Sequence, residues 1–288
     1  MNPLSEEKTE RPISKLVAED CHIHTCLSSC ADKNMRLESV LMKAHECQLE
    51  RIVILDHLWG REPAESELPN KLRESKKDLE GNFPSLEVKL SGEFNYDERL
   101  VREDLCDQFD FVTAGVHSLD RFGIFISNSM PVNILSIIVN KYGLKQILDF
   151  FLEQSVAMFS DNRVLVGAHP LNLYLYLEGV GYKSLDHMTK NASALHAVVK
   201  DKGFEINGSM FKRVADNLQS PAPRTFGKCM EAYARVLENL APHVGFFTLA
   251  SDAHSISEIG QLSYCDKIIE MAGIRGKISN APIFDSAK

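Results

Sequence analysis

The fold of this protein is indicated most directly by residues 51–57, which read RIVILDH. Isoleucine, valine and leucine form an apolar run of strand length. The run ends in Asp56 and His57, whose side chains can bind a metal ion or take part in catalysis. The stretch therefore predicts a buried β-strand with chemically functional residues at its carboxyl end.

Six further runs of this kind occur along the chain, and amphipathic helical patterns lie between most of them. The strand-like runs cover residues 16–20, 86–93, 109–116, 163–168, 203–208 and 244–252. The helical patterns cover residues 37–47, 133–159, 184–200, 225–239 and 257–271, and a polar surface helix is expected within 61–84. Strand and helix alternating about seven times predict a parallel sheet.

A closed α/β barrel is the form that we expect for this sheet, because one barrel takes about 250 residues and the chain has 288. We predict a single barrel domain over residues 16–288, preceded by a charged lead-in at residues 1–15. Hydrophobic residues make up 44% of the chain and charged residues 25%, a composition that excludes a disordered or collagen-like protein.

Charge and cysteine content narrow the classes of function. The formal net charge is −8, whereas a general binder of nucleic-acid backbones is usually basic, so the sequence carries no strong nucleic-acid signal. No apolar run approaches the roughly 18 residues of a membrane helix, and the polar N-terminus does not resemble a signal peptide. The seven cysteines, an odd number, are expected to be free thiols, which favours a cytoplasmic protein.

Metal-binding residue types occur at the carboxyl ends of six of the seven predicted strands. They are His22, His24, Asp56, His57, Glu93, His117, His169, Asp252 and His254. Because all strands of a parallel barrel open on the same face, we expect these side chains to converge in one bowl. Buried carboxylates repel one another, and divalent cations offset that repulsion. Imidazole and carboxylate together suit Zn, Mn or Fe better than Ca or Mg, so the sequence predicts a multinuclear metal site.

Several of these segments resemble the motifs of the polymerase and histidinol phosphatase (PHP) family in order, spacing and strand context. DCHIHTCLSSCAD at residues 20–32 resembles the first motif of the family, and ILDH at residues 54–57 is similar to the second. SGEFNYDE at residues 91–98 resembles the segment that bears the family's bridging glutamate. The later motifs are matched by FDFVTAGVHSLD at 109–120, LVGAHP at 165–170, FEING at 204–208 and LASDAH at 249–254.

The resemblance implies a distorted (β/α)7 TIM-like barrel of the PHP type, with three divalent metal ions (Zn, Mn or Fe) and nine ligands. One ion would be bound by His22, His24, Glu93 and Asp252, and a second by Glu93, His117 and His169, with Glu93 bridging. A third would be bound by Asp32, His57 and His254. Cys26 and Cys30 lie in the same loop as Asp32 and compete with it, although their ordinary interpretation is as loop thiols. Asp56 would orient an imidazole through its other nitrogen.

The activity that the resemblance implies is hydrolysis of a small phosphomonoester, as in the histidinol-phosphatase branch, by attack of a metal-activated hydroxide on phosphorus. The segment after His169, PLNLYLY, lacks the acidic and basic residues common in that branch, so the substrate is assigned only as a small phosphorylated molecule. Basic residues on loops after the strands are candidates for binding its phosphate, with Arg121 first. The other candidates are Arg61, Lys212, Arg213 and Arg224.

Three alternatives stay open. A PHP-type nuclease or nucleotide phosphatase would need a basic channel beside the metals, for which the charge balance offers little. A non-catalytic metal-binding module would be expected to have lost ligands. An amidohydrolase on a related barrel would need a lysine-centred or smaller metal site, and no lysine ends a predicted strand.

Overall fold

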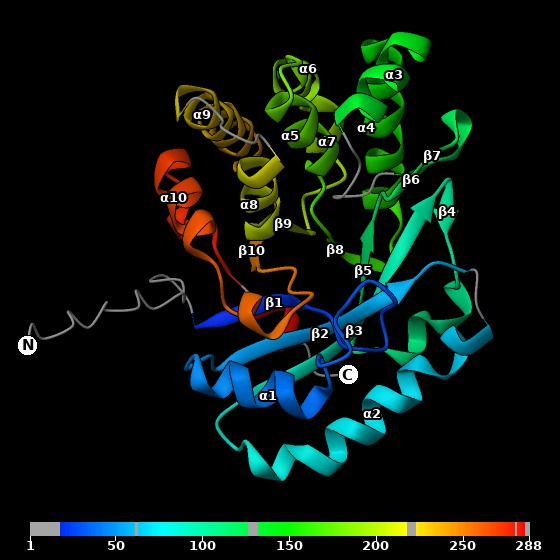
Figure 1. The fold of residues 1–288 in the computed structure, drawn as a ribbon, viewed down its shortest axis with the longest axis vertical. Helices are drawn as coiled ribbons and strands as arrows, with labels where there is room; N and C mark the ends of the chain where they lie inside the picture. The colour runs from blue at the N-terminus through cyan, green and yellow to red at the C-terminus, as the bar shows by residue number, and fades with distance from the viewer. Residues whose placement is uncertain (1–17, 61–62, 126–131, 218–222, 280, 286–288) are drawn as a thin grey trace, which may run out of the picture.

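A nearly closed barrel of seven parallel strands forms the centre of the molecule (Figure 1). The computed structural model describes residues 18–60, 63–125, 132–217, 223–279 and 281–285. In spatial order the strands are β1 (Glu19–Ile23), β2 (Arg51–Leu58), β3 (Glu87–Asp97), β5 (Phe111–Gly115), β8 (Val164–Gly167), β9 (Gly203–Asn207) and β10 (Phe246–Ala250). The predicted TIM-like parallel barrel is confirmed, and the predicted lead-in at residues 1–15 lies outside the described residues.

The barrel closes where β1 meets the segment that follows β10. Ile23 and Ala253 form an isolated parallel bridge. The backbone N–H of His24 donates to the carbonyl oxygen of Ala253 at 3.1 Å, and the N–H of Ala253 donates to the carbonyl oxygen of His22 at 3.3 Å. Closure of the sheet therefore brings the first and the last of the predicted ligand motifs together.

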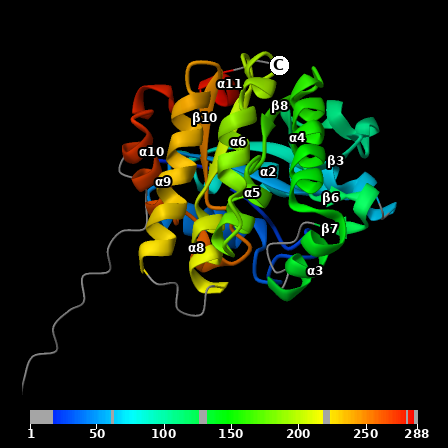
Figure 2. The ribbon, with the colours of Figure 1, turned by 90° about the horizontal axis from the view of Figure 1, so that it is seen from above.

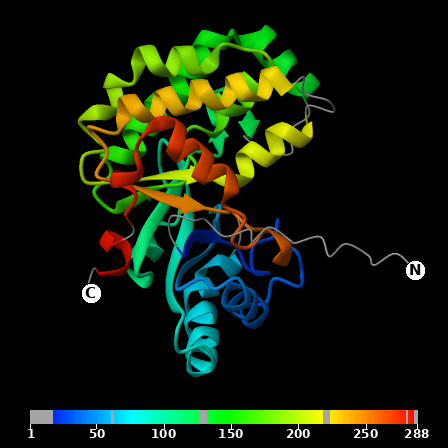
Figure 3. The same cartoon turned by 90° about the vertical axis from the view of Figure 1, so that its left-hand side faces the viewer.

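Helices cover the outside of the barrel. α1 (Leu37–Glu46) and α2 (Leu68–Leu79) lie below strands β1 to β3 in Figure 1. Seen from above in Figure 2, α4 (Leu144–Ser160), α6 (Ser184–Asn191), α9 (Pro223–Leu240) and α10 (Ser263–Ala272) lie side by side. Figure 3 shows the same two groups of helices from the side. The other helices are α3 (Val132–Tyr142), α5 (Asn172–Gly179), α7 (Ser193–His196), α8 (Gly208–Asn217) and α11 (Ala281–Phe284), and the short strands are β4 (Arg99–Leu100), β6 (Ser118–Leu119) and β7 (Ile124–Phe125).

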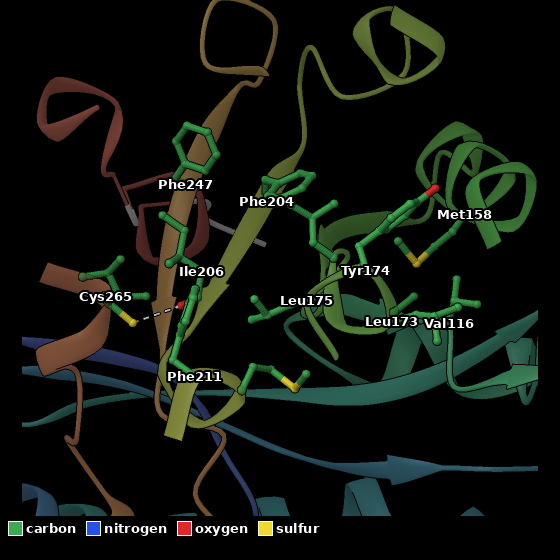
Figure 4. Packing of buried hydrophobic residues seen from close by; sticks show 14 of the residues in the cluster. Val116, Met158, Leu173, Tyr174, Leu175, Phe204, Ile206, Phe211, Phe247 and Cys265 are labelled. Atoms are coloured by element: carbon green, nitrogen blue, oxygen red, sulfur yellow. Dashed lines mark hydrogen bonds between the residues drawn. The ribbon is translucent and has the colours of Figure 1, made fainter. Parts of the chain in front are cut away.

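Two hydrophobic clusters lie on opposite faces of the strands. Ile52 and Ile54 belong to a large cluster beneath the helices, part of which is drawn in Figure 4. Val53 and Leu55 belong to a smaller cluster, with Cys21, Phe111, Val166, Phe246, Ile283 and Phe284. Because side chains alternate along a strand, the smaller cluster fills the inside of the barrel. Its upper layer forms an apolar floor beneath the carboxyl ends of the strands.

Three of the predicted helices are interrupted. The pattern over 133–159 is divided between α3 and α4 at Gly143, whose φ of 82° is not helical. The pattern over 257–271 is broken at Gly260, with a φ of 75°, and α10 begins at Ser263. The pattern over 184–200 is divided between α6 and α7. The sequence does not indicate α5, because almost all its side chains are buried and NLYLYLEG therefore has no polar face.

Candidate metal centre

The predicted ligands meet at the carboxyl end of the barrel. His57 follows Val53 and Leu55 on the inward face of β2, and its register partner on β3 is Glu93. Glu93 is fully buried. Strand alternation and parallel register therefore place an imidazole and a carboxylate side by side over the apolar floor.

Glu93 is the centre of the cluster. Its Oε1 accepts hydrogen bonds from the Nε2 atoms of His117 and His169, both at 2.8 Å. Its Oε2 lies 2.8 Å from His57 Nδ1 and 3.5 Å from the Nε2 atoms of His22 and His24. One carboxylate thus contacts five imidazoles from four strands or their ends, which is the position that a bridging ligand requires.

A β-bulge brings the first two histidines into this cluster. The register between β1 and β2 shifts between Asp20 and Ile23, so simple alternation is interrupted at this point. Both rings nevertheless turn inward, and the Nε2 atoms of His22 and His24 lie 3.0 Å apart.

Glu205, on β9, orients the ring of His22. Its Oε2 accepts a hydrogen bond from His22 Nδ1 at 2.8 Å, and its Oε1 accepts from the backbone N–H of His169 at 3.1 Å and from Asn207 Nδ2 at 3.0 Å. An ionised carboxylate only accepts, so a proton resides on Nδ1 and Nε2 faces the centre. Glu205 does not stand out from its place at a strand end, although an acidic residue within an apolar strand is the signal that could have revealed it.

Asp56 orients the ring of His24 through Ser28. Asp56 Oδ1 accepts from Thr25 N and from Ser28 Oγ, both at 2.7 Å. Since the hydroxyl proton of Ser28 is used in that bond, its oxygen accepts from His24 Nδ1 at 3.3 Å and from the backbone N–H of His57 at 3.0 Å. The carboxylate itself lies 3.9 Å from His24 Nδ1, so the orienting contact predicted for Asp56 runs through the serine hydroxyl.

With both Nδ1 protons fixed, two Nε2 lone pairs would face each other at 3.0 Å unless a positive charge lies between them. In the protein alone that charge is a proton. Burial by itself lowers the pKa of His22, but the carboxylates of Glu205, Glu93 and Asp252 raise it well above its usual value. Burial lowers the pKa of His24 well below its usual value. These opposite shifts favour His22 over His24 as the ring that carries a proton on Nε2.

The spacing of the donor atoms also fits a cation. Asp252 Oδ1 lies 3.2 Å from His24 Nε2 and 3.5 Å from His22 Nε2, and Glu93 Oε2 lies 3.5 Å from each of these nitrogens. Tetrahedral ligands about 2.1 Å from a zinc ion lie about 3.4 Å from one another. These buried side chains could therefore hold a metal ion.

The ligand atoms of His22, His24 and Glu93 all lie within 4.8 Å of one another, and so do those of two further groups. One is His57, Glu93 and His117, and the other is His24, His57 and His254. Among the described residues, His57 Nδ1, Glu93 Oε2 and His117 Nδ1 are buried without a hydrogen-bond partner. Buried polar atoms are rarely left unpaired, and a cation beside His57 Nδ1 and Glu93 Oε2 would satisfy these two, whereas His117 meets Glu93 through its other nitrogen, Nε2.

The electrostatics of the cluster are dominated by Glu93. Burial raises the pKa of its carboxyl, but His57, His117 and His22 hold that pKa well below its usual value. Burial lowers the pKa of His57, yet the Glu93 carboxylate raises it to about 10. Burial keeps the pKa of His117 below its usual value. The centre thus combines an ionised carboxylate with one imidazole of raised pKa, His57, and one of lowered pKa, His117.

Two of the predicted ligands have left-handed backbone conformations. φ is 31° at His169 and 52° at Asp252, and neither residue is glycine. Such conformations cost about 1–3 kcal/mol each and gather at functional sites. The carbonyl oxygen of Asp252 also contacts His254 Nδ1 at 2.8 Å, so its unusual backbone orients a neighbouring ligand.

The loop between β1 and α1 completes this end of the barrel. Asp32, the ninth predicted ligand, exposes its side chain, and the ligand groups formed by the described residues do not include it. Cys30, in the same loop, is likewise absent from these groups, although the rings of His57 and His254 influence its thiol. Burial raises the pKa of this thiol, but the two rings lower it to about 7.

One aromatic side chain lies against a predicted ligand, and two of the candidate phosphate-binding residues contact side chains outside the cluster. Trp59 stacks on His57, with ring centroids 4.1 Å apart and an interplanar angle of 27°. The guanidinium of Arg121 lies over the ring of Phe150 at 4.2 Å, and Lys212 Nζ lies 3.6 Å from Glu258 Oε1. Arg61 and the side chains of Arg213 and Arg224 lie outside the described part of the structure.

Comparison with known proteins adds no family to these observations. The chain matches no model of a known protein family and no curated protein sequence. No helix of the described residues combines the length and the apolar character needed to cross a bilayer. The fold and the site together define a TIM-like α/β barrel with buried histidine and carboxylate clusters that could hold metal ions.

Proposed function

We propose that this protein is a metal-dependent phosphoesterase of the PHP type that hydrolyses a small phosphomonoester, as histidinol phosphatases do. The observation that carries the proposal is the convergence of the His22 and His24 Nε2 atoms on Glu93 and Asp252 within 3.0–3.5 Å. Such a set of buried donors is costly to assemble unless cations bind to it.

Three divalent ions, Zn, Mn or Fe, are the proposed cofactors. The first would be held by the four residues named above, and the second by Glu93, His117 and His169. His57 and His254 would contribute to the third, for which Asp32 stays the predicted partner from the sequence. Sharing of Glu93 Oε1 by His117 and His169 at 2.8 Å supports its role as the bridge.

The residues of the chain prepare this centre for phosphate chemistry. When bound, the metal ions would lower the pKa of water and offset the charge of phosphoryl oxygens. Glu205 and Ser28 keep the Nδ1 protons of His22 and His24 away from the centre, so that both Nε2 atoms remain available. A phosphate dianion that approaches a chain of net charge −8 needs local positive charge, and the buried cluster is where cations could supply it.

The test is a panel of phosphoesters offered to protein loaded separately with Zn, Mn or Fe. We expect release of inorganic phosphate from a small monoester, loss of that activity in His22→Ala, and retention of it in His45→Ala, which changes an exposed histidine on α1. Circular dichroism would confirm that both variants fold. Nucleotide release from oligonucleotides in place of phosphate release would favour the nuclease alternative, and metal binding without turnover would favour the non-catalytic one.

A further inference from the structure

The turn from β9 into α8 lies beside the segment that carries Asp252. Asn207, the last residue of β9, is the register partner of Ala250, the last residue of β10. Ser209 and Asp252 each follow two residues later, so the two parallel strands deliver them to the same place. A Cβ at Gly208 would lie 2.9 Å from a backbone carbonyl oxygen, and glycine therefore permits this close approach. The turn brings the side chain of Ser209 against one of the predicted ligands.

The hydroxyl of Ser209 lies between two acceptors. Its Oγ is 2.9 Å from Asn207 Oδ1 and 3.0 Å from Asp252 Oδ2. The backbone N–H of Met210 also donates to Asn207 Oδ1, at 3.2 Å, which fixes the orientation of the amide. Because the hydroxyl has one proton, the two acceptors share it in a three-centre hydrogen bond. The carboxylate is the stronger acceptor and receives the larger part.

The two carboxylate oxygens of Asp252 face in different directions. Oδ1 lies 3.2 Å from His24 Nε2 and 3.5 Å from His22 Nε2, whereas Oδ2 meets the hydroxyl of Ser209. The backbone of Asp252 is left-handed, with a φ of 52°, and such a conformation persists only where the surroundings hold it. Ser209 and Asp252 are both buried, so their hydrogen bond fixes which oxygen faces the cluster.

The contact belongs to a chain of hydrogen bonds that runs behind the cluster. Asn207 Nδ2 donates to Glu205 Oε1 at 3.0 Å, and Glu205 Oε2 accepts from His22 Nδ1 at 2.8 Å. The chain thus connects two predicted ligands of the same ion by a route that avoids the ion. In order, its members are Asp252, Ser209, Asn207, Glu205 and His22.

We propose that Ser209 is a positioning residue, which holds Asp252 Oδ2 so that Oδ1 alone faces the cation that His22 and His24 would bind. The inference rests on the proposed metal centre and adds to it a residue that does not itself bind the cation. Without this hydrogen bond the carboxylate can rotate and present both oxygens to the centre. Partners that orient metal ligands commonly affect metal affinity strongly.

Ser209→Ala tests the role, because alanine removes the hydroxyl, adds no volume and favours a helix. We expect the affinity of the purified full-length protein for zinc to fall about 10- to 100-fold, as measured by competition with a chelator. Ser209→Thr keeps a hydroxyl and should keep most of the affinity. The matched control is Ser263→Ala, at an exposed serine that begins α10, and it should leave the affinity unchanged. Circular dichroism checks that each variant folds.

Cobalt(II) gives a second readout, because its visible absorption weakens as its coordination number rises. At equal cobalt binding, we expect weaker visible bands in Ser209→Ala than in the wild-type protein, since both oxygens of Asp252 can then bind. Wild-type affinity and an unchanged spectrum in folded Ser209→Ala would overturn the role of Ser209 while the metal centre stands. An equal loss of affinity in Ser263→Ala would overturn it as well. Failure of the wild-type protein to bind zinc or cobalt would overturn the metal centre and the role of Ser209 with it.

Discussion

Glu205 Oε2 and His22 Nδ1 form a 2.8 Å hydrogen bond between two fully buried side chains. The other oxygen of the same carboxylate holds the backbone N–H of His169, so one glutamate supports ligands of two proposed metal positions. Residues that orient metal-binding imidazoles in this way commonly matter for affinity as much as for geometry.

The first prediction concerns this glutamate. Glu205→Gln keeps the shape of the side chain but can accept only at one atom, so either His22 or His169 loses its partner. We expect metal affinity to fall about 10- to 100-fold, since losses of this size follow removal of such partners. Competition with a chromogenic chelator would measure it, and unchanged affinity in a folded variant would contradict the role.

The second prediction uses a glycine beside a ligand. A Cβ at Gly115 would lie 2.6 Å from Cε1 of His117, so Gly115→Ala should displace this ring from Glu93. Overpacking of this kind typically costs about 1–3 kcal/mol. We expect lower metal content by elemental analysis together with a lower melting temperature. Gly81→Ala is the matched control, because a Cβ there meets no heavy atom within 4 Å.

The third prediction concerns removal of metal. A cation that binds only the folded chain stabilises it by about 2.7 kcal/mol per site when its concentration is 100 times the dissociation constant. We therefore expect a chelator to lower the melting temperature of the loaded protein and zinc to restore it. In His22→Ala the effect of the chelator should be smaller, and equal effects in both proteins would argue against binding at this position.

The fourth prediction is the effect of pH without metal. The pKa of His57 is raised to about 10 in the folded protein, above its usual value near 6.5. A raised pKa means that the protonated ring stabilises the fold below about pH 6.5 and that this contribution is lost as pH rises towards 10. Chelator-treated protein should therefore lose stability through this window, as measured by urea unfolding.

Bound metal should reverse that dependence. Cations bound by His22 and His57 would displace the protons of these rings, so apparent metal affinity should rise as the pH rises through the same window. Calorimetry in buffers of different ionisation enthalpy would detect the released protons. Binding that takes up protons, or an affinity independent of pH, would contradict this account of the cluster.

The sequence predicts the barrel well because each strand is a short apolar run that can be told from the longer helical patterns around it, as RIVILDH illustrates. It also predicts correctly that four side chains lie together, since parallel strands share one open face. They are His22, His24, Glu93 and His117. The hydrophobic pattern does not reveal a helix that is buried on almost all sides, as α5 is. It also fails for Glu205 and Ser28, because a partner of a ligand is recognised by its contacts rather than by its place at a strand end.

Loop positions are the hardest to assign from spacing. Cys26, Cys30 and Asp32 are separated by only a few residues, and each could reach a cation in some loop conformation. The backbone bond from Asp32 to His254 anchors the loop to the segment after β10, and the side chain of Asp32 is exposed. A bond between distant segments of this kind has no signature in the local sequence.

Trp59 gives this centre a built-in reporter. It is the only tryptophan of the chain, and its indole stacks on a ring proposed to bind metal. The intrinsic fluorescence of the whole protein therefore originates largely one ring away from the cluster. Quenching by a paramagnetic ion could follow occupancy in real time, with no label attached and no substrate known.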